Sequence, residues 1–248
     1  MNELYYIEQT NFNVSEIIYN ILYNDCIHFG FIKNDKANIS GFLNMLIPNL
    51  ALNREMLHSE FLKNNNNDEN MAIIIEQNIY NIYLKTFDLT DDVKVNIQLR
   101  INKENKKEFL KIQDCYLKKY NMTFSMYIKT LLYEYAMRPL FQREILFILK
   151  VKNELLKALK QSLFVNFCLG DNLKIKMVPV DIAVNPKTDQ NFIFGYSINK
   201  DIEVIKISFI NDLSLTDEKL SLTNNEYKEI VDLEIEFFND LNNRERVD

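Results

Sequence analysis

The order of apolar and polar positions predicts a mostly helical region over residues 1–92. Apolar side chains recur at helical spacing within residues 3–24, which predicts an amphipathic helix there. They are Val14, Ile17, Ile18, Ile21 and Leu22. Residues 26–33 (CIHFGFIK) instead alternate in the manner of a short strand. The chain therefore begins with a helix and a strand before its next helical segment.

Two further helices are expected in this region. Asn38 suits the N-cap of a helix that contains Phe42, Leu43, Leu46 and Leu50. Because Pro48 falls inside that helix, the sequence predicts a kink or a new start at this position. After a polar loop over residues 63–70, apolar positions at helical spacing predict a helix from about Glu69 to Phe87.

The segment 93–145 carries the clearest pattern. Apolar residues from Val93 to Ile101 alternate strictly with Lys94, Asn96, Gln98 and Arg100, which predicts a half-buried strand with one polar, cationic face. A charged amphipathic helix is expected over residues 102–120, and Thr123 suits the cap of a second helix. Pro139 should end or restart that helix. A long helix is expected from about Gln142 to Leu163, and its residues 146–163 form the connection to the next domain.

From residue 164 the period of the pattern shortens. Four short strands are predicted within residues 173–178, 181–184, 191–196 and 204–209. Turn signals lie at residues 186–190 and 199–201. Successive short strands with little helix between them predict a small β-barrel domain over residues 164–248, which ends in an acidic helix over residues 224–241. The fold class is therefore α+β, helical first and β-rich last.

The charge of the chain is unevenly distributed. Its net charge is −6, yet residues 93–150 hold 12 basic and 5 acidic side chains, a net of +7 that leaves −13 for the rest. Such asymmetry indicates a local site for a polyanion on an otherwise acidic body. The alternative interpretation is a helix face that merely meets water.

The strand and two helices of residues 94–136 resemble the ribbon-helix-helix family. The resemblance rests on KVNIQLRI (94–101), NKENKKEFLKIQDCYLKKY (102–120) and MTFSMYIKTLLYEYA (122–136). It implies a strand ribbon that enters the DNA major groove with Lys94, Asn96, Gln98 and Arg100 outward. It also implies that a phosphate binds at Thr123 and Ser125, where the second helix begins. Further cations at Lys103, Lys106, Lys107 and Lys129 complete the expected nucleic-acid-binding set.

A single ribbon strand needs a partner because its edge and its core are open. The chain could form a homodimer, or its first half could supply a second copy as an internal pseudo-dimer. NISGFLNMLIPNLA (38–51) does echo TFSMYIKTLLYEYA (123–136), and the strand predicted over residues 26–33 precedes it. Both arrangements remain open from the sequence.

The stretch 174–215 resembles a WYL domain. Its counterparts of the family motifs are Val178-Pro179, NFIFGY (191–196) and KISFI (206–210). The resemblance implies a small SH3-like or Sm-like barrel with a ligand face at Phe192, Phe194, Tyr196 and Lys206. Family members bind nucleic acid or small ligands, and some that pair this domain with a ribbon-helix-helix unit are accessory proteins of RNA-targeting CRISPR systems that bind single-stranded RNA. Residues 165–248 carry a net charge of −7, however, so the domain could serve dimerisation or partner docking, with the aromatic residues as strand core.

Motifs for other chemistry are missing from the sequence. Cys26, Cys115 and Cys168 are too few and too far apart for a disulfide framework or a zinc finger. The pair Arg54 and His58 is one residue short of the R-x-x-x-x-H spacing of some ribonucleases. We therefore expect no catalytic residues, metal or cofactor, and the protein is expected not to be an enzyme. No apolar run is long enough for a membrane span, so a cytoplasmic protein is expected.

The sequence thus predicts a nucleic-acid-binding regulator or accessory protein, acting on DNA or single-stranded RNA. Transcription regulation and antiviral defence are the roles that the two resemblances imply. The alternative is an interaction module or inhibitor whose acidic surface docks on a basic partner that handles nucleic acid, such as a CRISPR effector.

Overall fold

The computed structural model describes residues 8–64, 68–90, 93–169 and 173–244. The chain is of mixed α and β structure and divides into two compact units, Met1–Arg138 and Pro139–Asp248. The boundary falls at Pro139, within the stretch 93–145 that the sequence predicts to be one segment. Among the described residues, no helix is long and apolar enough to cross a membrane.

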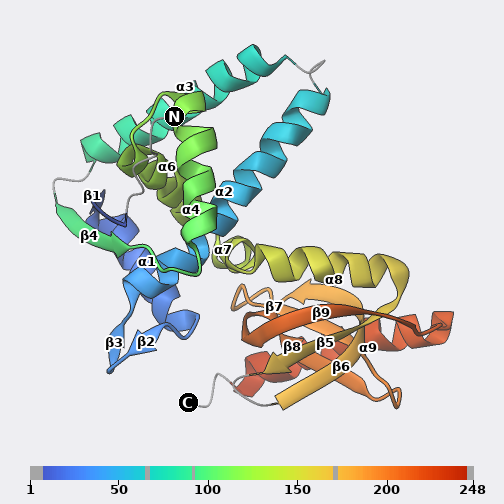
Figure 1. Ribbon diagram of the computed structural model, residues 1–248. Coiled ribbons are helices and arrows are strands. Elements are labelled where there is room, and N and C mark those ends of the chain that lie inside the picture. The colour runs from blue at the N-terminus through green and yellow to red at the C-terminus, as the bar shows by residue number, and fades with distance from the viewer. Residues whose placement is uncertain (1–7, 65–67, 91–92, 170–172, 245–248) are drawn as a thin grey trace. The chain divides into compact units, whose positions relative to one another are not determined.

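The first unit is built on a ribbon of two antiparallel strands (Figure 1). Strand β1 (Gln9–Ser15) pairs with β4 (Lys94–Arg100) along its whole length. Phe12 and Val14 are buried on one face of β1, and Ile97 and Leu99 are buried on the same face of β4. The strand predicted around residues 93–101 is therefore confirmed, and its partner lies within the same chain.

The helix predicted over residues 3–24 is wrong in its first half. Polar Asn11 and Asn13 alternate with the buried Phe12 and Val14, and this period of two belongs to a strand. Helix α1 (Glu16–His28) begins only after Ser15, whose hydroxyl accepts a hydrogen bond from the Ile18 N–H. The earliest residues of the expected helix lie outside the described part of the chain.

The strand predicted over residues 26–33 is also wrong. Cys26, Ile27 and His28 are the last residues of α1. A small hairpin follows, formed by β2 (Ile32–Lys33) and β3 (Lys36–Ala37). Asn34 and Asp35 have φ values of 51° and 58°, which a two-residue hairpin turn with a right-handed strand twist requires.

Helix α2 (Ile39–Asn64) continues through Pro48, where a kink or a new start was expected, so the new start is wrong. A proline cannot donate to the carbonyl four residues earlier, here that of Asn44. The side-chain amide of Asn105 donates to this carbonyl instead, at 2.8 Å. The helix continues because a residue distant in sequence replaces the missing hydrogen bond. Helix α3 (Glu69–Thr90) follows and lies beside α2 and α6.

The segment after β4 is helical as predicted, with one irregularity. Helix α4 (Lys106–Lys111) passes into a π-helical turn, η1 (Ile112–Leu117), and then into α5 (Lys118–Tyr120). Asn121, with a φ of 50°, ends it. Helix α6 (Phe124–Ala136) begins after Thr123, whose hydroxyl accepts from the Met126 N–H at 3.2 Å. Helix α6 is largely buried and contacts α1, α2, α3 and β1, so it forms the centre of the first unit.

The second unit holds one antiparallel sheet in the order β8-β7-β6-β5-β9. Its strands are β5 (Leu163–Leu169), β6 (Leu173–Val184), β7 (Asn191–Ser197), β8 (Ile202–Lys206) and β9 (Ile210–Lys219), with a 3-10 turn η2 (Ile207–Phe209) before β9. In the described part of this unit, β8 and β9 form the two edges and do not pair. The SH3-like or Sm-like barrel is therefore not formed, and the sheet is open.

Three helices complete the second unit. Helices α7 (Leu140–Phe147) and α8 (Leu149–Gln161) stand where one long connecting helix was predicted. The C-terminal helix α9 (Asn224–Arg244) packs on β6 and β7 (Figure 1). Buried Glu144 of α7 accepts hydrogen bonds from the backbone N–H of Asn191 at 2.7 Å and from its side-chain amide at 2.6 Å, which joins α7 to β7.

Candidate functional site

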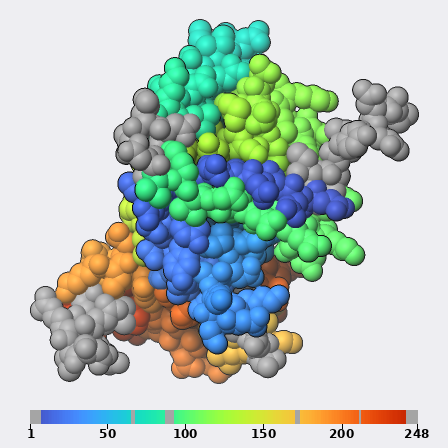
Figure 2. Space-filling view, turned by 90° about the vertical axis from the view of Figure 1, so that its left-hand side faces the viewer, coloured from blue at the N-terminus to red at the C-terminus, as the bar shows by residue number. Residues whose placement is uncertain are grey.

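The outward face of the ribbon gathers polar side chains from both strands. The register places Gln9 opposite Arg100, Asn11 opposite Gln98, and Asn13 opposite Asn96. The side-chain amide of Asn96 donates to Oδ1 of Asn13 at 2.8 Å. Figure 2 shows β1 in dark blue and β4 in green, side by side on the surface that faces the viewer. The exposed set is Gln9, Asn11, Asn13, Lys94, Asn96, Gln98 and Arg100.

A buried apolar layer holds this face in place. The inward side chains Phe12, Val14, Ile97 and Leu99 are each at most 4% exposed. Since alternate residues of a strand point to opposite faces, the burial of these four fixes the outward direction of their neighbours. The polar face is therefore presented by a rigid support.

The N-termini of two helices contact the ribbon, both near the end at which Gln9 pairs with Arg100. At the start of α2, the Ser40 hydroxyl accepts from the Arg100 backbone N–H at 3.2 Å. At the start of α6, the Ser125 hydroxyl donates to the Asn11 carbonyl at 3.5 Å and lies 3.1 Å from the Thr10 hydroxyl. Each helix thus contacts the strand of the other half of the unit.

The strands and helix caps of the two halves follow an internal repeat of constant spacing. Asn11 of β1 and Asn96 of β4 occupy equivalent positions about the centre of the ribbon, 85 positions apart in the sequence. The caps Asn38 and Thr123 are also 85 positions apart. The sequence similarity between residues 38–51 and 123–136 therefore lies in two helices at equivalent positions of the repeat, α2 and α6. The strand of the first copy is β1, and not residues 26–33.

The structure brings together most of the predicted nucleic-acid-binding residues. Lys94, Asn96, Gln98 and Arg100 share the outward face, and Thr123 is exposed at the start of α6. Lys103, Lys106 and Lys107 are exposed between β4 and the first turn of α4, whereas Ser125 and Lys129 are half-buried.

Sequence reasoning missed the contribution of β1, which supplies Gln9, Asn11 and Asn13 to the same face. The alternation in QTNFNVS (9–15) carried the signal for this strand. The apolar residues of α1 that follow at helical spacing masked it, because a single helix was extended backwards over both patterns.

Arg54 and His58 lie one turn apart on α2 and belong to a buried ionic network. Arg54 donates through Nε to Glu134 at 3.1 Å and through Nη1 to Thr130 at 2.9 Å, and its guanidinium covers the Tyr80 ring at 3.9 Å. His58 contacts Glu76, Glu69 and Lys119. These side chains connect α2, α3, α5 and α6, so their contacts stabilise the packing of the four helices. Among the described residues, no cluster of His, Cys, Asp and Glu could hold a metal ion.

The predicted ligand face of the second unit is covered. Phe192, Phe194 and Tyr196 are at most 7% exposed and pack against α9. The Tyr196 hydroxyl donates to Glu229 at 3.0 Å, and burial together with this carboxylate raises its pKa to about 12. Lys206 is half-buried, and burial lowers its pKa while the Glu144 carboxylate opposes that shift. A base could not stack on these rings while α9 occupies this position.

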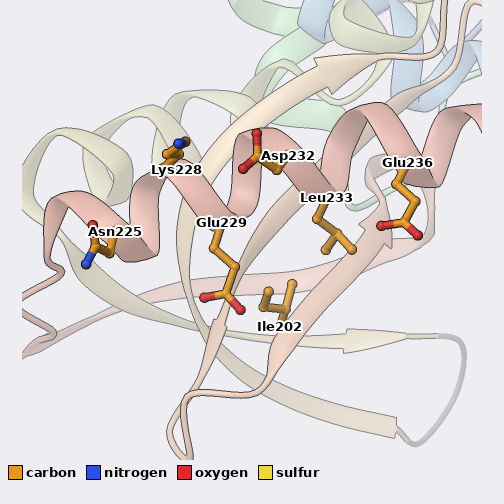
Figure 3. A pocket seen from close by; sticks show the side chains of 7 residues that line it. All are labelled: Ile202, Asn225, Lys228, Glu229, Asp232, Leu233 and Glu236. Atoms are coloured by element: carbon orange, nitrogen blue, oxygen red, sulfur yellow. The ribbon is translucent and has the colours of Figure 1, made fainter.

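The outer side of α9 is acidic. Figure 3 shows a shallow pocket in which Glu229 and Leu233 of α9 point toward Ile202 of β8, with Asp232 and Glu236 on neighbouring turns. Three carboxylates and one lysine, Lys228, line this pocket. A surface of this charge repels phosphate groups, so the ribbon is the better candidate site for a polyanion.

No protein-family model and no curated protein sequence matches the chain. In fold, the chain is similar to a solved structure described as the crystal structure of a CRISPR Cas-related protein. The two share 18% sequence identity, with a TM-score of 0.62, and the match covers 92% of this chain and 67% of that chain. The comparison therefore establishes that this chain and a CRISPR Cas-related protein share a fold.

Proposed function

We propose that the first unit is a ribbon-helix-helix pseudo-dimer within one chain, and that it binds nucleic acid through the outward face of β1 and β4. The observation that carries this proposal is the exposed set of amides and cations on two paired strands above a buried apolar layer. The repeat of strand and capped helix at a spacing of 85 positions supports the pseudo-dimer.

The chemistry of the face suits base edges. Asn and Gln side chains can form two hydrogen bonds with adenine, and Arg and Lys pair with guanine, in the major groove. A two-stranded ribbon fits the major groove of B-form DNA, whereas the major groove of A-form RNA is too narrow for side chains to read. Duplex DNA is therefore the ligand that this geometry favours, and single-stranded RNA is the alternative that the resemblances suggest.

Groups around the ribbon suit the phosphate backbone. The N-terminus of α6 at Thr123 presents backbone N–H groups, and a helix N-terminus attracts anions. Exposed Lys103, Lys106 and Lys107 follow β4 directly. In this proposal they fix the position of the protein on the nucleic acid, while the ribbon provides any base preference.

The setting we propose is that of a CRISPR-associated accessory protein. The similarity in fold to a CRISPR Cas-related protein supports this assignment. The resemblance of residues 174–215 to a WYL domain agrees with it, since that pairing of units is known in such accessory proteins. In this proposal the second unit regulates or docks, because its charge does not suit phosphates.

A charge-reversal pair tests the proposal. Lys94→Glu together with Arg100→Glu places two negative charges on the ribbon, and binding to nucleic acid at low salt should be lost. Lys187→Glu with Lys228→Glu is the matched control, because it changes the net charge equally at two exposed positions of the second unit. If both double variants lose binding to the same extent, the ribbon is not the site.

A second candidate function rests on the acidic face of α9. Glu229, Asp232 and Glu236 are exposed there, which would suit docking on a basic protein that handles nucleic acid. Under this alternative, the ribbon variant Lys94→Glu with Arg100→Glu keeps its partner. Replacement of the three carboxylates by amides releases it.

A further inference from the structure

Five large apolar side chains are exposed on the outward face of α3 in the first unit. Met71, Ile74 and Ile82 are 52%, 54% and 60% exposed, and Ile75 and Ile79 are 36% and 40% exposed. At 3.6 residues per turn, these five positions fall within one stripe along the helix, which also includes the exposed Asn78. Such a stripe on a surface helix marks an interaction site, because monomeric soluble proteins rarely expose large contiguous apolar patches.

The stripe is flanked by opposite charges at its two ends. Asp68 stands just before α3 and Lys85 lies near its C-terminal end, and both are exposed. A parallel pairing of two such helices would set Asp68 against Asp68 and Lys85 against Lys85. An antiparallel pairing sets each aspartate against a lysine.

The same antiparallel pairing also matches four of the five apolar residues. When Asp68 lies opposite Lys85 of a second copy, Met71 lies opposite Ile82 and Ile74 opposite Ile79, while Ile75 lies opposite the polar Asn78. Four apolar positions of the stripe therefore pair with one another on reversal. A two-fold symmetric interface requires such self-complementarity, because both subunits present the same residues. Binding of an unrelated protein would not require the stripe to match itself.

The surface beside the stripe can receive a side chain. A hollow of about 340 Å³ lies between α2, α3 and α6, and it is lined by Leu57, Phe61, Ile75 and Ile79 among others. Ile74 of the second copy would lie opposite Ile79, at the rim of this hollow. Leu57 of α2, 47% exposed, extends the apolar surface.

From these observations, we propose that the chain forms a two-fold homodimer in which the α3 helices of two copies pack antiparallel along the stripe Met71–Ile82. The occupant of the apolar face is a second copy of this chain. Each dimer then carries two ribbons. If the ribbon binds nucleic acid, one dimer can therefore hold two nucleic-acid segments.

The oligomeric state tests this proposal independently of nucleic-acid binding. Sedimentation velocity over a concentration series should show a dimer for the natural protein and a monomer for Ile74→Glu with Ile79→Glu. The matched control is Val231→Glu with Ile235→Glu, which places the same charges on two exposed apolar positions of α9, 50% and 61% exposed, and should leave the dimer intact. Circular dichroism confirms that each variant is folded.

The register is tested by cysteine pairing in a Cys115→Ser background. A mixture of Met71→Cys and Ile82→Cys proteins should form a disulfide-linked heterodimer. Met71→Cys alone should not, because two copies of residue 71 would lie about 16 Å apart along the paired helices, too far for a disulfide. A monomeric natural protein, a dimer that persists in Ile74→Glu with Ile79→Glu, or linkage of Met71→Cys to itself would each overturn the proposal.

Discussion

Asn13 and Asn96 face each other across the ribbon, with Nδ2 of Asn96 2.8 Å from Oδ1 of Asn13. This hydrogen bond joins the two halves of the internal repeat on the face that we propose as the binding site. Both residues are exposed, and this hydrogen bond uses neither the Asn96 oxygen nor the Asn13 amide group. Under the proposed function, the two residues orient each other and also contact bases.

Asn96→Ala should lower base discrimination more than overall affinity. A side chain that makes two hydrogen bonds to a base contributes about 1–3 kcal/mol of discrimination, or roughly 5- to 150-fold. The measurement selects a preferred duplex from a random pool and then compares affinities for that duplex and for single base-pair changes. Lys107→Ala, which removes a candidate phosphate contact, should weaken all duplexes alike. A uniform loss in Asn96→Ala would contradict the reading role.

Arg54→Met should destabilise the first unit strongly. The guanidinium is buried and paired with Glu134 at 3.1 Å, so its removal leaves this carboxylate with Arg138 as its remaining cation, at 2.9 Å. Breaking a buried pair costs about 3–5 kcal/mol, and because Arg138 keeps part of the compensation we expect a loss toward the lower end of that range. Chemical denaturation measures the change. Lys111→Met is the control, because its ion pair with Glu55 is exposed and contributes about 0–1 kcal/mol. Equal losses in both variants would contradict a structural role for the buried network.

Glu144→Ala should destabilise the second unit. Its carboxylate accepts two hydrogen bonds from Asn191, one of them from the backbone N–H, and that buried donor would be left unpaired. The expected cost is about 1–3 kcal/mol. Thermal unfolding followed at several wavelengths should locate the change in the second unit. Glu154→Ala, which removes an ion pair with the exposed Lys157 on α8, should be nearly neutral.

Cys26 should make the first unit less stable as the pH rises into the alkaline range. Burial raises the pKa of this thiol to about 11. The unfolded chain releases the thiol proton at a lower pH than the folded chain, so the stabilisation is complete below the ordinary thiol pKa. It is lost as the pH rises toward 11. The difference in unfolding free energy between the natural protein and Cys26→Ala should therefore shrink above about pH 9. A difference that stays constant with pH would show that the thiol is not shielded.

The sequence predicted the elements whose pattern is strictly local. The alternation from Val93 to Ile101 identified β4, and Thr123 correctly marked the start of α6. The cationic half of the candidate site followed from these two elements alone. Residues 224–241 likewise carried the signal of α9.

The remaining features depend on contacts between distant residues. Continuity of α2 past Pro48 requires the Asn105 side chain, which lies on another element. The closure of a barrel depends on whether β8 meets β9, and the pattern within each strand is the same in either case. The half of the site on β1 was missed because its short alternation runs directly into the helical spacing of α1.

The most direct test of the proposed function is fluorescence anisotropy of the purified protein with labelled duplex DNA, single-stranded DNA and single-stranded RNA over a salt series. We predict binding that weakens steeply with salt, with log K falling by about 0.9 per contacted phosphate for each unit of log salt concentration on duplex DNA. A preference for single-stranded RNA would keep the ribbon as the site but replace the ligand. If none of the three binds at low salt, the ribbon is not a nucleic-acid interface and the proposal is contradicted.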